Sequence, residues 1–140
     1  MTSVCVGPRM SHYVVELFDI SAQELDSEIY VSSLMSSIIG QLQLNAVETI
    51  THKFEIGVTC MAILSESHAT IHTWPEYGYL YLELLSCNGL SVTMFEQAIS
   101  TLFPSASKHY FDVTSLQANK EQVVRTGYPK PPVHKSKASP

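Results

Sequence analysis

Four β-type segments that follow one another with short connections constrain this chain most. Residues 47–54 and 68–73 alternate between two faces, residues 58–64 are largely apolar, and residues 79–86 carry three leucines at alternate positions. Alternation with a period of two is typical of a strand, and a short apolar run is typical of a buried one. The four segments therefore predict a mostly antiparallel sheet.

Two stretches with apolar residues at helical spacing lie on either side of these strands in the sequence. One runs from Val31 to Leu42, after a capping-box pattern between Ser21 and Glu24, and the other ends before Pro104. Strands are expected at residues 12–19 and 108–114, which gives the order β-α-β-β-β-β-α-β.

Six strands and two helices in 140 residues favour an α+β fold, a two-layer sandwich with both helices on one face of the sheet. The opposite face, with Tyr79, Tyr81 and Glu83, then has no cover within one chain. We therefore expect this face to meet a partner.

Length and composition favour one globular domain over residues 1–126. Residues 127–140 are rich in Pro and Lys and are expected to be disordered. The content of 45% hydrophobic residues hints at subunit burial, whereas no apolar run is long enough for a membrane span. The first residues lack a signal-peptide pattern, which predicts a cytoplasmic protein.

Charge and cysteine content exclude two further classes. The net charge is −5, and residues 128–140 hold three lysines and no acid, so the rest of the chain is more acidic still and a nucleic-acid partner is not expected. The three cysteines, Cys5, Cys60 and Cys87, have no regular spacing, which argues against a disulfide framework and predicts free thiols.

Residues 64–87 gather most of the reactive side chains: LSESHATIHTWPEYGYLYLELLSC. Glu66 and Ser67 open an ESH triplet, the run IHTWPEYGY spans residues 71–79, and Cys87 follows twenty positions after Ser67. This ordered pattern closely resembles the self-processing segment of the prokaryotic-type S-adenosylmethionine decarboxylases. The resemblance extends from about residue 12 to residue 115.

The resemblance implies a proenzyme that cuts itself between Glu66 and Ser67, giving a β chain of residues 1–66 and an α chain of residues 67–140. Ser67 would become a pyruvoyl group, a self-made cofactor that forms a Schiff base with the substrate and accepts electrons as carbon dioxide leaves. Family members of this size pair sheet to sheet, so a homodimer is implied as well.

The resemblance also assigns roles to single residues. His72 would be the proton acceptor in processing, and Cys87 the proton donor in turnover. Thr59 would hydrogen-bond a carbonyl oxygen during rearrangement, Phe54 would stack on the adenine, and Glu76 would hold the ribose hydroxyls. Trp74 could face the sulfonium. Taken alone, these residues have plainer explanations. Ser67 could be a surface serine, His72 a structural histidine and Cys87 a buried thiol. Phe54 could be a core aromatic residue and Glu76 a solvated acid.

Alternatives remain at this stage. His68, His72 and Cys87 could suggest a metal site. A His-x-x-x-His spacing, however, brings both imidazoles to one metal ion only in a helix, and we expect a strand here, so no metal is predicted. The favoured function is decarboxylation of S-adenosylmethionine to supply aminopropyl groups for spermidine synthesis. The others are a pyruvoyl-dependent decarboxylase of ornithine or arginine and a non-catalytic, unprocessed partner subunit. The segment Glu55–Gly57 is one residue shorter than the family pattern, and Cys60 replaces a common glycine, both on the adenine side.

Overall fold

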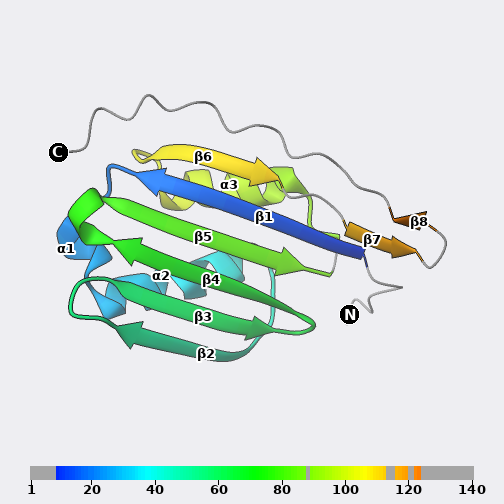
Figure 1. Ribbon diagram of the computed structural model, residues 1–140, viewed down its shortest axis with the longest axis horizontal. Helices are drawn as coiled ribbons and strands as arrows, with labels where there is room; N and C mark the ends of the chain where they lie inside the picture. The colour runs from blue at the N-terminus through cyan, green and yellow to red at the C-terminus, as the bar shows by residue number, and fades with distance from the viewer. Residues whose placement is uncertain (1–8, 88, 113–115, 120–121, 124–140) are drawn as a thin grey trace.

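A computed structural model describes residues 9–87, 89–112, 116–119 and 122–123 of the chain. Its sheet has the spatial order β2-β3-β4-β5-β1, and β6 and β7 both pair with β1 (Figure 1). All of these pairings are antiparallel. The strands are β1 (Arg9–Phe18), β2 (Ala46–Lys53), β3 (Val58–Leu64), β4 (Ser67–Trp74), β5 (Tyr79–Ser86), β6 (Ser107–Asp112), β7 (Leu116–Asn119) and β8 (Gln122–Val123).

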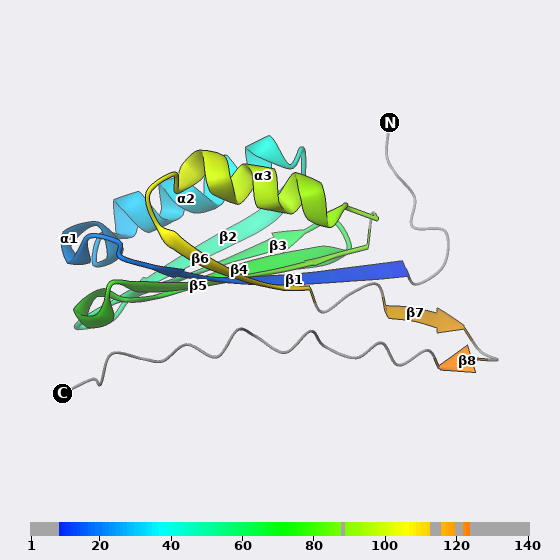
Figure 2. The ribbon, with the colours of Figure 1, turned by 90° about the horizontal axis from the view of Figure 1, so that it is seen from above.

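The helices lie together on one side of this sheet, as Figure 2 shows from above. They are α1 (Ala22–Leu25), α2 (Glu28–Gln41) and α3 (Val92–Leu102), and a 3₁₀ turn, η1 (Pro75–Tyr77), joins β4 to β5. The expected α+β two-layer architecture, with two main helices on one face of an antiparallel sheet, is confirmed. Within the described ranges no helix is both long and apolar enough to cross a membrane.

Strand alternation separates the two faces of the sheet. On β5 the leucines Leu80, Leu82 and Leu84 are fully buried under the helices, whereas Tyr81 and Glu83 between them are only partly buried. The same alternation places His68, Thr70, His72 and Trp74 on the second face, because Ala69 and Ile71 enter the core. We call this second side the open face.

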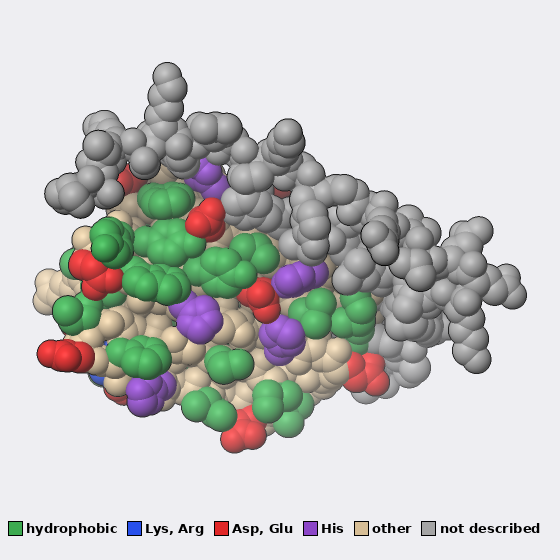
Figure 3. Space-filling model, in the orientation of Figure 1, with side chains coloured by type: hydrophobic (Ala, Val, Ile, Leu, Met, Phe, Trp, Pro, Cys, Tyr) green, Lys and Arg blue, Asp and Glu red, His purple; other side chains and the backbone are tan. Residues whose placement is uncertain are grey.

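Hydrophobic side chains remain exposed on the open face (Figure 3). Ile50, Met61 and Ile63 each keep about half of their surface accessible. Ile50 and Met61 are direct partners across β2 and β3, so they form a contiguous apolar area at that edge. A patch of this kind is typical of a surface that meets a partner.

Several details differ from the sequence prediction. The first long helix begins at Glu28 with Ser27 as its cap, whose side chain accepts a hydrogen bond from the Tyr30 N–H. Ser21 caps only the short α1 and makes no side-chain capping bond, so the predicted capping box is wrong. The first strand starts at residue 9 rather than 12, and β7 and β8 were not expected. The expected tail, residues 127–140, lies outside the described residues.

Candidate functional site

The predicted cleavage point lies in the tight turn between β3 and β4. Leu64 pairs with Ser67 across the two strands, so only Ser65 and Glu66 form the turn. Glu66 has a φ of 61°, the left-handed region that non-glycine residues seldom adopt. Such a conformation costs about 1–3 kcal/mol and persists only where the surroundings impose it. The residue on the N-terminal side of the Glu66–Ser67 peptide bond is therefore conformationally strained.

The surroundings of this turn hold it in place. The Ser65 N–H donates to the Asn45 carbonyl at 3.1 Å, and the Asn45 amide donates to the Ser65 hydroxyl at 3.2 Å. The Ser67 hydroxyl, which is partly exposed, donates to the Ser65 carbonyl at 3.3 Å. Ser67 thus sits with its hydroxyl turned back over the turn that contains the strained residue.

Cys87 lies at the same end of the sheet, one residue beyond β5. Its sulfur is 3.5 Å from Oε2 of Glu66, and its side chain is buried. The structure therefore brings Glu66, Ser67 and Cys87 together, as the sequence pattern suggested. We call this group, with its turn, the turn end of the sheet.

The oxidation state of Cys87 differs from the sequence prediction. Cys60 is a free, buried thiol, and burial raises its pKa, whereas Cys87 takes part in a disulfide. The prediction that every cysteine is a thiol is therefore wrong for Cys87 in this structure. Two cysteines need no regular spacing in sequence to meet in space, so sequence spacing could not show this.

Thr59 and His72 form a second pair, at the opposite end of the same strands. They are direct partners across β3 and β4, and the Thr59 hydroxyl is 2.8 Å from Nδ1 of His72. Burial lowers the pKa of His72, and the Glu83 carboxylate offsets part of this effect. His72 is therefore a neutral imidazole at pH 7, able to accept a proton.

His72 does not reach Ser67 within one chain. The two residues are five apart on one extended strand, which separates their Cα atoms by about 16 Å at 3.3 Å per residue. An odd spacing also directs their side chains to opposite faces of the sheet. A single chain therefore does not bring His72, the expected proton acceptor of processing, to Ser67.

The three expected substrate contacts lie at the same end as His72, and we call this group the histidine end. Phe54 follows β2, is half exposed, and packs edge-on against the His52 ring at 4.6 Å. Trp74 ends β4 and packs against Tyr79 at 5.3 Å between ring centroids. Glu76 is exposed in η1.

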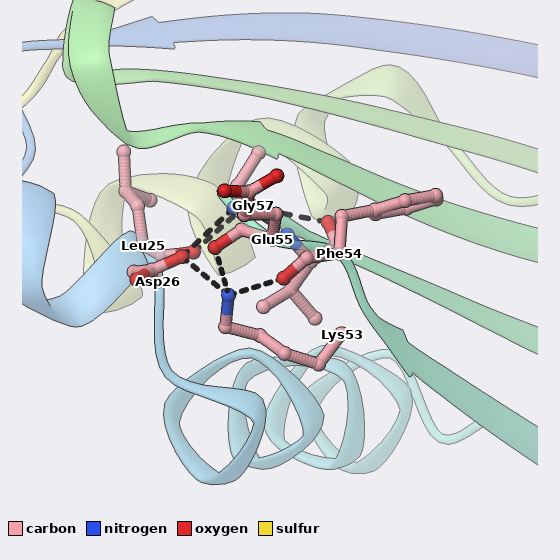
Figure 4. A network of polar contacts seen from close by, with 8 residues as sticks. Leu25, Asp26, Lys53, Phe54, Glu55 and Gly57 are labelled. Carbon is pink, nitrogen blue, oxygen red and sulfur yellow. Dashed lines mark hydrogen bonds and ion pairs between the residues drawn. The ribbon is translucent and has the colours of Figure 1, made fainter.

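An ion pair fixes the turn that carries Phe54 (Figure 4). One oxygen of Asp26 accepts from both the Lys53 ammonium and the Gly57 N–H, each at 2.8 Å. These two contacts lower the pKa of Asp26, and the hydrogen bond from Gly57 has the larger effect. Gly57 has a φ of 101°, and a Cβ there would lie 2.7 Å from the Thr73 carbonyl oxygen, so only glycine fits. The shortened segment is thus tightly built.

The sequence analysis gave no role to a polar group in the middle of the open face. His68 and Tyr81 both hydrogen-bond the carboxylate of Glu83, and His12 lies beside it. The strand alternation places these residues on one face, but their contact depends on the pairing of β1, β4 and β5, which the sequence does not specify. No group of three or more potential metal ligands is gathered within the described part of the chain.

Comparison with known proteins gives consistent matches. The family model described as S-adenosylmethionine decarboxylase matches residues 11–120. An S-adenosylmethionine decarboxylase proenzyme of Parasynechococcus marenigrum is 38% identical over 92 residues, which cover 65% of this chain and 70% of that protein. One from Archaeoglobus fulgidus is 29% identical over 102 residues, covering 71% and 91%.

A solved structure agrees in fold. The adenosylmethionine decarboxylase of Aquifex aeolicus superposes with a TM-score of 0.62 over 75% of this chain and 90% of that one. Its sequence identity is 19%, so this likeness concerns the fold alone.

Proposed function

Because this chain belongs to the S-adenosylmethionine decarboxylase family, we propose that it cleaves itself between Glu66 and Ser67 and then decarboxylates S-adenosylmethionine. The product would supply aminopropyl groups for spermidine synthesis. The observation that carries the proposal is the left-handed conformation of Glu66, directly before the serine that the family pattern marks for cleavage.

Self-cleavage can be written from the groups at the turn end. The Ser67 hydroxyl adds to the Glu66 carbonyl carbon, the C–N bond breaks, and the hydroxyl proton passes to the freed amine, so the amide becomes an ester. A base then removes the Cα proton of Ser67 and the Cβ–O bond breaks, which releases Glu66 as a carboxylate. The dehydroalanine that remains at position 67 tautomerises to an imine, takes up water and loses ammonia, which leaves a ketone.

The residues at the turn end fit this chemistry. The strain at Glu66 raises the energy of the uncleaved chain, and cleavage releases it because the two ends are then free to separate. A pyruvoyl ketone at position 67 would supply the electron sink for loss of carbon dioxide. The products would be a β chain of residues 1–66 and an α chain of residues 67–140, and residues 1–126 of the two chains together would form one domain.

In this proposal the base for the reaction comes from a second protomer. His72 and Thr59 lie about 16 Å along the strand from Ser67 and on the other face of the sheet. We propose a homodimer in which the open faces meet in opposite directions, so that the histidine end of one protomer completes the turn end of the other. The exposed Ile50, Met61 and Ile63 favour such burial.

Within this arrangement each group has one task. The Thr59 hydroxyl accepts from Nδ1 of His72 when the proton is on that nitrogen, which leaves Nε2 as the base for elimination. In turnover, Cys87 would return a proton to the substrate carbon, a step that requires its thiol form. Reduction of the disulfide at Cys87 is then a condition for decarboxylation, but not for self-cleavage.

The substrate contacts follow from the same pairing. Phe54 offers a half-exposed ring for the adenine, Glu76 offers oxygens for the ribose hydroxyls, and Trp74 with Tyr79 offers an aromatic surface for the sulfonium. All three positions belong to the histidine end, so the nucleoside would be bound by one protomer while its amino group reaches position 67 of the other.

Mass spectrometry of the denatured full-length chain tests the proposal. We expect fragments of residues 1–66 and 67–140, the second with a ketone terminus, whereas Ser67→Ala stays intact. Carbon dioxide release from labelled S-adenosylmethionine, ornithine and arginine then identifies the substrate. A wild-type chain that remains whole would refute self-cleavage, and release from ornithine or arginine alone would refute the substrate.

A further inference from the structure

The carboxylate of Glu83 lies at the centre of the open face and is reached from both neighbouring strands. Val14 of β1 and Thr70 of β4 are its direct partners across the sheet. His12 and His68 each stand two residues before these partners, and both lie opposite Leu85. The two imidazoles therefore approach Glu83 diagonally from the two neighbouring strands, both from the same end of the sheet. One side chain thus connects three strands.

The contacts of this carboxylate are specific. Its Oε1 is 3.0 Å from Nε2 of His68, and its Oε2 accepts from the Tyr81 hydroxyl at 3.2 Å. Burial alone would raise the pKa of Glu83, but the His68 hydrogen bond and the charge of His12 bring this pKa below its ordinary value. Glu83 is therefore an ionised acceptor at neutral pH, the stronger kind of hydrogen-bond partner.

His12 occupies the remaining side of the group. Its Nε2 is 3.4 Å from Oε2 of Glu83, is buried, and makes no hydrogen bond. The charge of His12 is one of the causes that lower the pKa of Glu83. His12 thus supports the carboxylate, while His68 carries the only hydrogen bond from this group toward β4 that the described residues show.

His68 is the second residue after the proposed cleavage point and directly follows Ser67. On the preceding side, Asn45 anchors the turn through Ser65. On the following side, the Glu83 hydrogen bond anchors the start of β4 through His68. A strained backbone persists only where its neighbours over-determine it, and these two anchors enclose the strained Glu66.

We propose that Glu83 is a positioning residue of self-cleavage: by holding the imidazole of His68, it fixes the start of β4 and keeps the Glu66–Ser67 peptide in its reactive conformation. This inference rests on the proposed self-cleavage and adds a residue to which the family pattern gave no role. Glu83 touches none of the reacting atoms and acts through His68.

A double-mutant cycle on cleavage tests this role. The full-length wild type, Glu83→Gln, His68→Ala and the double variant are made by cell-free synthesis, and the intact fraction is followed by mass spectrometry. Glu83→Gln removes the charge from this hydrogen bond and His68→Ala removes its donor, so each single change should slow cleavage about tenfold. The double variant should be no slower than the slower single variant, because the two residues act as one unit.

Two controls separate positioning from general damage. Glu16→Gln removes a carboxylate from the same face, where it accepts from Tyr79, and should cleave at the wild-type rate. Thermal unfolding of each variant in a Ser67→Ala background compares their stability in one uncleaved state. We expect the cleavage rate of Glu83→Gln to fall while its melting temperature stays close to that of Glu16→Gln.

Three results would overturn the inference. The first is wild-type cleavage by Glu83→Gln, and the second is a double variant whose loss is the product of the single losses. The third is a loss in Glu16→Gln equal to that in Glu83→Gln. Each leaves the proposed function standing if the wild type cleaves, whereas an intact wild-type chain refutes both proposals together.

Discussion

The turn end and the histidine end of the sheet hold different halves of one proposed chemistry. The turn end has a strained residue, a hydroxyl and a sulfur, but its nearest imidazole, His68, is bound to Glu83. The histidine end has a neutral imidazole hydrogen-bonded to Thr59, with aromatic rings around it, but no nucleophile. The difference teaches that neither end alone holds all the groups of the proposed cleavage, and the separation along the strand is the reason why we propose two protomers.

Removal of His72 should have the largest effect on the histidine end. His72→Ala deletes the base for elimination, and general-base groups contribute about 10²–10⁴-fold to a rate. We expect cleavage to slow by about that factor in a mass-spectrometric time course. His52→Ala, a histidine on the same face at β2, is the control and should cleave normally. Equal cleavage by His72→Ala and wild type would remove the histidine end from processing.

Cys87→Ala should separate the two activities of the turn end. The variant keeps Ser67 and the strained turn, so it should cleave, but it should lose most decarboxylation because no thiol returns the proton. For the wild type, added reductant should raise carbon dioxide release and leave cleavage unchanged, because Cys87 is disulfide-bonded in the structure. Cys60→Ala, which removes the free buried thiol, serves as control. Full turnover by Cys87→Ala would place the proton donor elsewhere.

The two ends also differ in how far the sequence predicts them. The turn end follows from a contiguous pattern, ESH plus Cys87, and the structure places these residues together. The position of His72 could have been questioned from parity alone, since residues five apart on a strand face opposite sides. The parity of the spacing gives the face of each side chain, but it does not show where a second chain would lie in the proposed dimer.

The supporting contacts lay beyond sequence reasoning for a physical reason. The Glu83 group depends on the register of β5 against β1 and β4, and the Asp26–Lys53 pair joins a helix junction to a turn 27 positions away. Register and helix packing arise from the whole core, which no local pattern describes. The wrong helix start has the same origin, because Ser21 and Ser27 are both good caps and only packing decides between them.

Phe54→Ala should affect the histidine end in substrate binding only. Stacking of an aromatic side chain on a base contributes about 1–3 kcal/mol, so KM for S-adenosylmethionine should rise about tenfold. Cleavage should proceed at the wild-type rate, because the ring plays no part in the Glu66–Ser67 bond. Ile56→Ala, an exposed apolar residue of the same turn, should leave KM unchanged. An unchanged KM in Phe54→Ala would contradict adenine stacking.

The pH dependence of cleavage gives the smallest expected effect. Burial lowers the pKa of His72 below its ordinary value of 6.5, with Glu83 and Tyr81 as the titratable groups beside it on β5. A lowered pKa means that the neutral base persists to more acidic pH. The midpoint of the decline in cleavage rate should therefore lie below pH 6.5, as measured by quenched time points at a series of pH values. A decline centred above pH 6.5 would contradict a buried His72 as the base.

Mixed dimers test most directly whether one site is built from two chains. Ser67→Ala and His72→Ala chains, distinguished by mass, are each expected to stay almost uncut alone. When both are synthesised together, a dimer can join Ser67 of the His72→Ala chain with His72 of the Ser67→Ala chain. We predict that the His72→Ala chain is then cut after Glu66, while the Ser67→Ala chain stays whole. If neither chain is cut although mixed dimers form, the turn end and the histidine end do not complete one another, and the account is wrong.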